Sequence, residues 1–274
     1  MSVQSLLNID RRVIYVILFV VLLVPLFRPL GLPLPITREA KATFDFLNSL
    51  APGSLVLMIN STGPSTEAEL YVQTVAMVRH AMAKGLKIII CALSVEAPPY
   101  NDRVFDTYAA GHKYEYGKDY LILPYKAGSE TAMAAIARDI KSLFQNDARN
   151  RPLSQFPLWS QVKDIKSFGV VIDIGGGESQ RWMLGHIEGP HKVPCIAAIT
   201  AVILAVTQPY FSAGQLKGIL SGLNGAAEYE TLAKVPGVAM SGMDAQSLGH
   251  MWVVILVLLG NIAYFLQKPS AKKH

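Results

Sequence analysis

The sequence has little charge and little cysteine. Charged residues make up 16% of its 274 residues, whereas about 25% is usual in soluble proteins. The two cysteines, Cys91 and Cys195, each lie inside an apolar run, and no CxxC pair or Cys/His zinc spacing occurs. We therefore expect two buried free thiols, with a disulfide as the alternative, and no metal site.

Several functional motifs are also missing. The chain contains no GxGxxG, no GxxxxGK[ST] and no GxSxG, so neither a nucleotide cofactor nor a serine-hydrolase elbow is indicated. The net charge is +5, but both signs are mixed in stretches such as NDRVFD, whereas a nucleic-acid partner requires a basic face. We expect no cofactor and no nucleic-acid partner.

Two long apolar stretches are present, one near each end of the chain. They cover residues 13–27 and about 250–266, and Trp252 and Tyr264 lie near the ends of the second, as in an interfacial aromatic belt. The sequence predicts one N-terminal and one C-terminal transmembrane helix in a lipid bilayer. The expected parts are an anchor at 1–34, an α/β domain at 35–247, and a second transmembrane helix with a basic tail at 248–274.

The basic residues around these stretches predict an orientation. Arg11 and Arg12 precede the first stretch, and Lys268, Lys272 and Lys273 follow the second, while no Lys or Arg lies between Lys234 and the second stretch. The positive-inside rule then predicts a two-pass protein of the cell membrane with both termini in the cytoplasm. The α/β domain would face the periplasm or the exterior.

The central region alternates apolar strands with helical segments. Strands are expected near 53–60, 86–93, 119–125 and 169–174, and residues 194–207 are read as a fifth strand, with a buried helix or a membrane-dipping segment as alternatives. Continuous apolar strands between helices indicate a parallel sheet covered on both faces. The predicted fold is α/β, a three-layer αβα domain with a mainly parallel sheet, Rossmann-like or crotonase-like.

Polar and glycine residues follow several of the expected strands. In such folds ligands bind where parallel strands end, so these residues form a candidate site for a small anionic ligand, with Lys126 supplying the charge. The candidate residues are Asn60, Ser61, Thr62, Gly63, Lys126, Gly128, Ser129, Gly175, Gly176 and Gly177. The alternative is that they serve only the turns, which need glycine and capping residues whatever the function.

A small-residue repeat occurs near the C-terminus. Gly214, Gly218, Gly222 and Ala226 recur every four residues, which predicts a smooth stripe on one helix. Such a stripe packs against a neighbouring helix in lipid, or against the domain's own sheet. Asn261, within the second apolar stretch, is a candidate contact to another helix, or bonds water near the headgroups.

Catalytic arrangements are sparse. The strand followed by NSTGPS resembles the oxyanion loop of crotonase-fold membrane peptidases, and Ser61 or Ser129 could be paired with Lys126. The small-residue segment around the nucleophilic serine of those enzymes is missing. His186, Glu188 and His191 match no standard metal site.

Three longer segments carry a resemblance. KAGSETAM, GQLKGILSGLNGAAEYE and MDAQSLGHMWVVILVLLGN together resemble an uncharacterised family of membrane-anchored proteins of bacteria and archaea, over most of residues 50–265. The family has no assigned activity, so the resemblance implies no catalytic residues.

Three hypotheses of function follow. The first is a non-enzymatic membrane protein acting in assembly or scaffolding, as a homo-oligomer and with other membrane proteins as further partners. The second is a ligand-sensing domain that binds a small anionic molecule at the carboxyl edge of the sheet. The third is a membrane-bound Ser/Lys hydrolase of crotonase-like fold.

Overall fold

The computed structural model describes residues 10–235 and 237–267. The chain divides into two compact units, an α/β domain over residues 34–239 and a two-helix unit made of the residues before and after it. The last helix, α12 (Val238–Gln267), begins at the C-terminal end of the α/β domain.

The centre of the domain is a six-stranded sheet in which all neighbouring strands are parallel, in the order β3-β2-β1-β4-β5-β6. The strands are β1 (Leu55–Asn60), β2 (Lys87–Ala92), β3 (Tyr120–Tyr125), β4 (Phe168–Gly175), β5 (Cys195–Ile199) and β6 (Leu216–Ser221). Every residue of β1 and β5 is buried, because helices cover both faces of the sheet.

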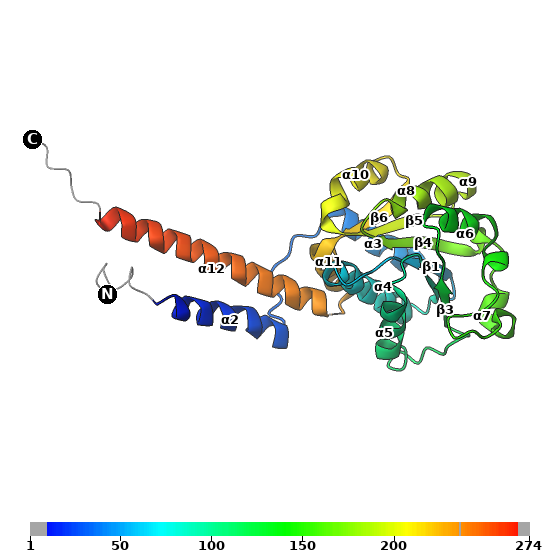
Figure 1. Ribbon diagram of the computed structural model, residues 1–274, viewed down its shortest axis with the longest axis horizontal. Helices are drawn as coiled ribbons and strands as arrows, with labels where there is room; N and C mark the ends of the chain where they lie inside the picture. Colours follow the sequence, from blue (N-terminus) through cyan, green and yellow to red (C-terminus); the bar gives the residue numbers. More distant parts are fainter. Residues whose placement is uncertain (1–9, 236, 268–274) are drawn as a thin grey trace, which may run out of the picture. The chain divides into compact units, whose positions relative to one another are not determined.

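Two sets of helices form the outer layers, and each closes its own apolar core (Figure 1). One face carries α3 (Arg38–Ser49), α4 (Val72–Ala83), α5 (Pro98–Tyr108) and α11 (Gly222–Ala233). The other face carries α6 (Glu130–Leu143), α7 (Pro157–Ser160), α8 (Ser179–Met183) and α10 (Leu204–Ser212). Shorter helical segments are η1 (Glu67–Tyr71), η2 (Leu153–Gln155), η3 (Ile165–Ser167), η4 (Leu184–Glu188), α9 (Gly189–His191) and η5 (Ala201–Ile203). The predicted α/β class with a parallel sheet is confirmed.

The strand order identifies the type of winding. From β1 the chain builds outward through β2 to β3, and then returns to the centre to build outward again from β4 to β6. This is the order of a doubly wound Rossmann-type sheet, whose direction reverses between the first and the fourth strand. The Rossmann-like alternative therefore fits, and the point between β1 and β4 is where ligand sites occur in such folds.

Two predictions for the last part of the domain were wrong. The run 194–207 is not one strand: β5 ends at Ile199, and the chain continues as η5 and α10. The small-residue repeat does not form one helix either. Gly214 lies in a turn, Gly218 lies in β6, and only Gly222 and Ala226 belong to α11. The sheet consequently has a sixth strand where a helical stripe was expected.

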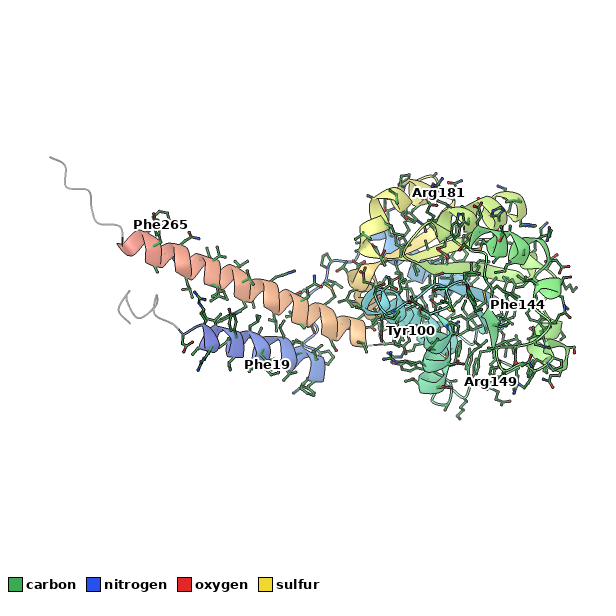
Figure 2. All side chains as sticks on the ribbon, viewed as in Figure 1. Phe19, Tyr100, Phe144, Arg149, Arg181 and Phe265 are labelled. Carbon is green, nitrogen blue, oxygen red and sulfur yellow. The ribbon has the colours of Figure 1, made fainter. Side chains whose placement is uncertain are left out.

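The two-helix unit consists of α2 (Arg11–Phe27) and α12. Residues Val238–Phe265 form the one helix of the described chain that is long and apolar enough to cross a membrane, judged by length and composition. Helix α2 has 17 residues, about 26 Å of helix, which is less than the ~30 Å of a bilayer core. A second span is therefore not established. Both helices expose apolar side chains, including Phe19 and Phe265 (Figure 2).

A buried carboxylate on α12 holds the segment that follows α2. The carboxylate of Asp244 accepts the backbone N–H groups of Leu30, Gly31 and Leu32 at 2.7, 2.9 and 3.0 Å. Gly31 makes this nest possible with φ +65°, a conformation that costs glycine little. The side chain of Leu22 also lies close to Gly249, so α2 and α12 are paired.

Asn261, the candidate helix contact, lies within α12. Its side-chain amide donates a hydrogen bond to the carbonyl of Val257 in its own helix at 2.8 Å. The basic residues used for the orientation at the C-terminus, Lys268, Lys272 and Lys273, lie outside the described residues.

Candidate functional site

The loops that follow β1 and β4 meet at the carboxyl edge of the sheet. The N–H of Ser61 donates to the carbonyl of Ile174 at 2.8 Å. Asn60 is fully buried, and its side-chain oxygen Oδ1 accepts both the N–H and the hydroxyl of Thr62, at 2.9 and 2.6 Å. Its amide donates to Asn101 on α5 at 2.7 Å. The side chain of Asn60 therefore shapes this loop and is not free for a ligand.

The glycines after β4 are required by close packing. A methyl group at Gly175 would collide with the hydroxyl oxygen of Ser179, and one at Gly176 would fall 3.2 Å from the methyl of Thr200. Gly177 has no atom near its Cβ position. Two of the three glycines are thus explained by the turn into α8, as the alternative interpretation of these residues predicted.

Asp173 on β4 is the unusual ionisable group at this edge. It is fully buried, and the hydroxyl of Ser179 donates to its Oδ2 at 2.7 Å, whereas Oδ1 has no hydrogen-bond partner among the described residues. Burial raises the pKa of Asp173 from 3.8 to about 7, and the hydrogen bond from Ser179 opposes that shift. In the sequence, Asp173 stands out as a single acidic residue inside the apolar run GVVIDI.

The sequence-predicted ligand residues are only partly brought together. Asn60 to Gly63 and Gly175 to Gly177 share the edge at β1 and β4. Lys126, Gly128 and Ser129 follow β3, which is separated from β4 by β2 and β1. The ammonium of Lys126 lies 5.3 Å from the ring centroid of Phe144, and Gly128 and Ser129 are exposed. The expected anionic site with Lys126 as its cation is therefore not formed at the β4 glycines.

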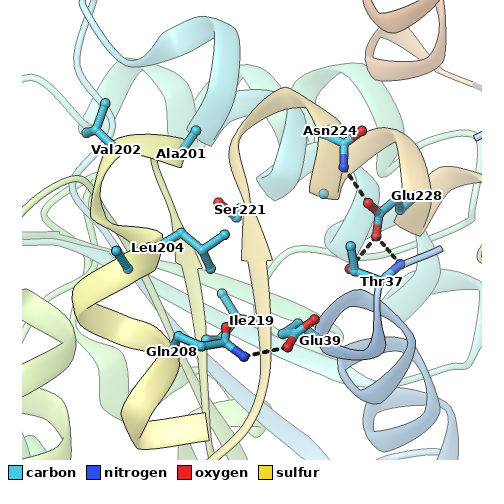
Figure 3. A pocket seen from close by; sticks show the side chains of 12 residues that line it. Thr37, Glu39, Ala201, Val202, Leu204, Gln208, Ile219, Ser221, Asn224 and Glu228 are labelled. Carbon is cyan, nitrogen blue, oxygen red and sulfur yellow. Dashed lines mark hydrogen bonds between the residues drawn. The ribbon is translucent and has the colours of Figure 1, made fainter. Parts of the chain in front are cut away.

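A cavity of about 730 Å³ lies at the carboxyl ends of β5 and β6. It is lined by segments from α3, η5, α10, β6 and α11 (Figure 3). The lining residues are Thr37, Glu39, Ala201, Val202, Leu204, Ala205, Gln208, Ile219, Ser221, Asn224, Gly225 and Glu228. We call it the Glu39–Glu228 cavity, after its two charged residues.

Each carboxylate of this cavity has a defined place. Glu228 on α11 is fully buried, and its Oε2 accepts the N–H and the hydroxyl of Thr37 at 2.9 and 2.5 Å. Its Oε1 accepts the side-chain amide of Asn224, one turn earlier on the same helix. Glu39 is half-buried, and Gln208 on α10 donates to it at 2.6 Å. Figure 3 shows these hydrogen bonds around the cavity.

Sequence analysis missed this site. Asn224 and Glu228 stand four residues apart, which places them on one helical face, but the other walls come from residues distant in sequence. Thr37 and Glu39 lie at the start of α3, and Gln208 directly follows the run 194–207 that was expected to be a strand. Only the tertiary structure brings these residues together.

A second cavity of about 470 Å³ lies between α4 and α5. Arg103 forms an ion pair with Glu67 at 2.6 Å and lies 4.5 Å from the ring centroid of Tyr71. The nearly buried carboxylate of Glu230 accepts the N–H groups of Gly237 and Ala239, at 3.1 and 3.3 Å. Glu230 therefore binds backbone N–H groups at the start of α12, while Arg103 and Glu67 are paired with each other.

Comparison with known proteins adds no assignment. No protein-family model matches the sequence, and no curated protein matches it significantly. The function must therefore be argued from the fold and the cavities.

Proposed function

We propose that the α/β domain is a small-molecule-binding domain of a membrane protein, and that the ligand occupies the Glu39–Glu228 cavity. The observation that carries this proposal is the position and size of the cavity. It lies at the carboxyl ends of β5 and β6, on the edge of the sheet at which doubly wound folds bind ligands, beside rather than at the reversal point between β1 and β4. Its 730 Å³ falls within the usual range for small-molecule sites.

The lining of the cavity supports the same function. Apolar side chains such as Leu204 and Ile219 form walls, while hydroxyl, amide and carboxylate groups are contributed from three helices and a strand. Ligand sites typically combine apolar walls with a few fixed polar groups. Glu228 is held by three hydrogen bonds, so its orientation is set before a ligand arrives.

The other two hypotheses have less support. Scaffolding by a homo-oligomer, with other membrane proteins as further partners, rested on a helical stripe that the fold does not contain. The Ser/Lys hydrolase paired Ser61 or Ser129 with Lys126. Ser61 follows β1 while Lys126 follows β3 and lies against Phe144, and Ser129, three residues after Lys126, lies on an exposed turn. Scaffolding remains a prediction that an oligomeric-state measurement would test.

We further propose the two-pass arrangement for the anchor. In this arrangement α12 crosses the bilayer, and α2 and its flanking residues do so alongside it, held by the Asp244 hydrogen bonds. Both termini would lie in the cytoplasm and the domain on the periplasmic or exterior side, as Arg11 and Arg12 before α2 indicate.

The binding function can be tested by closing the cavity. Ala205 lines it and is exposed, so Ala205→Phe should fill the space without overpacking the core. The full chain in detergent would be screened against metabolites by thermal shift, and Val206→Phe, on the same helix but outside the lining, is the matched control. Compounds that stabilise the wild type and the control, but not Ala205→Phe, would support the proposal. If the screen finds no compound with this pattern, the proposal is contradicted.

The topology has a separate test. Cys91 and Cys195 are fully buried, and burial raises the pKa of both thiols, so neither should react with an impermeant maleimide. Ser154→Cys, on the exposed 145–160 connection, should be labelled in intact cells. A cysteine appended after His274 should be labelled only after lysis. The reverse pattern would place the domain in the cytoplasm.

A further inference from the structure

The Glu39–Glu228 cavity is acidic. Glu39 and Glu228 are its only charged lining residues, and the lining contains no Lys, Arg or His. In the described part of the chain, neither carboxylate forms an ion pair with a basic side chain. The sequence predicted a site that binds an anionic ligand through the cation Lys126. The lining of this cavity carries negative charge instead, so it favours a cationic ligand.

The buried carboxylate has only neutral partners. Glu228 is fully buried and accepts hydrogen bonds from the backbone and hydroxyl of Thr37 and from the amide of Asn224. These dipoles satisfy its lone pairs but supply no counter-charge. Burying a carboxylate is costly unless it is paired as well as hydrogen-bonded, so a positive group entering the cavity would gain electrostatic energy near Glu228.

The second carboxylate lines the same cavity. Glu39 comes from α3 and accepts from Gln208 of α10, and Thr37, two residues before Glu39, donates to Glu228 of α11. Leu204 of α10 and Ile219 of β6 add aliphatic walls to the cavity. A ligand with two positive groups on an aliphatic chain would match both the charges and the walls.

We propose that the cavity binds an aliphatic primary amine, and that a diamine is the simplest ligand to satisfy it, with one ammonium at Glu228 and the other at Glu39. The proposal rests on the binding function proposed above and names its ligand class. Anionic ligands, and phospholipid headgroups through their phosphate, would meet two carboxylates and no basic side chain, and are disfavoured.

The test uses three probes of equal length on the full chain in detergent at low salt. They are pentane-1,5-diamine, the neutral pentane-1,5-diol and the anionic glutarate, each measured by isothermal titration calorimetry. The diamine should bind, and the diol and glutarate should bind at least tenfold more weakly, because neither supplies positive charge.

Two isosteric variants locate the site. Glu228→Gln removes the charge and keeps an acceptor for Thr37, with Asn224 turning its side-chain oxygen toward the new amide. Glu39→Gln changes a half-buried residue whose carboxylate accepts from Gln208, so the second variant tests the proposal even if the first folds poorly. Each should weaken diamine binding about tenfold to a hundredfold, and Ala205→Phe should abolish it. Glu115→Gln, an exposed carboxylate that pairs with Lys118, is the control and should leave the affinity unchanged.

The outcomes separate the two proposals. If the diol or glutarate binds in an Ala205-dependent way and the diamine does not, the amine inference is wrong while the binding function stands. If the diamine binds equally to wild type and to both glutamine variants, it binds elsewhere and the inference is also wrong. If no probe and no metabolite distinguishes Ala205→Phe from Val206→Phe, the binding function itself fails.

Discussion

Gly218 provides the sharpest test of the way the sheet and α3 pack. It lies in β6, directly beneath α3, and a methyl group at this position would fall 2.6 Å from the Cα and 2.7 Å from the N of Thr43. Contacts this short with backbone atoms cannot be relieved by rotating a side chain. Gly218→Ala therefore requires α3 to move away from the strand.

The size of the effect follows from what α3 carries. To restore an ordinary contact of 3.4 Å, the helix must retreat by about 0.8 Å, and it carries Ala40 and Leu47, both in the core. Overpacking of this kind costs about 1–3 kcal/mol. We expect Gly218→Ala to approach the upper value, which lowers the Tm of a domain of this size by about 6–12 °C.

The assay is thermal unfolding of the full chain in detergent, followed by circular dichroism. Gly185→Ala is the matched control, because no atom lies within 4 Å of its Cβ position in a helical segment; it should be neutral or raise stability by up to about 1 kcal/mol. Thr43→Ala should not rescue Gly218→Ala, because the obstructing atoms belong to the backbone.

The sign of the change decides between two structures. If Gly218 belonged to an exposed helical stripe, replacement by alanine would stabilise the protein by about 1 kcal/mol, since glycine is a poor helix former. A raised Tm for Gly218→Ala, or full rescue by Thr43→Ala, would refute the packing of α3 on β6 described above.

Three further predictions concern buried charges. Burial raises the pKa of Asp173 to about 7, so Asp173 should lower the stability of the domain progressively as the pH rises from about 4 to 7. Burial, with Lys84 nearby, lowers the pKa of His80 to about 4, so His80 should lower the stability as the pH falls from about 6.5 to 4. Because the two effects oppose each other, Asp173→Asn should leave a stability that rises with pH over 4–6.5, by up to about 1.4 kcal/mol per pH unit, in urea titrations; a flat profile would contradict this. His80→Gln, which retains a partner for Tyr229, should give the opposite slope, and a slope of the same sign as that of Asp173→Asn would count against a neutral buried His80. Asp244→Ala should accelerate amide hydrogen exchange at residues 30–32, because each N–H loses a charged acceptor worth about 1.5–3 kcal/mol; unchanged exchange there would show that the nest does not hold the segment.

Part of this fold could be predicted from the sequence because burial on both faces leaves a plain signal. Strands such as β1 and β2 are uninterrupted apolar runs bounded by turn residues, and their positions agree with the prediction to within a few residues. The order of the strands has no comparable local signal, since it depends on which helices pack on which face. That order decides the position of Lys126, and this is why the residues expected at one site lie apart.

The cavity illustrates a second limit of sequence analysis. Residues 201–206 are as apolar as a buried strand, but in the structure they leave Val202 and Val206 exposed and turn Leu204 toward the cavity. A short apolar run does not distinguish a strand from a helix. Once η5 and α10 are helical, Gln208 faces Glu39, and a wall of the cavity forms where continuous strand was expected.

The small-residue repeat shows how one pattern can arise from unrelated causes. A spacing of four returns to the same side in a strand as well as in a helix, so the spacing alone could not distinguish them. In the structure Gly214 has φ +76° in a turn, Gly218 admits the backbone of α3, and Gly222 has φ +61° beside Ala201. Gly214 and Gly222 are explained by their positive φ angles, and Gly218 is explained by the close approach of the α3 backbone. The close approach that the repeat suggested is real at Gly218 alone, and its partner is a helix of the same domain, which removes the sequence argument for an interface between copies of the chain.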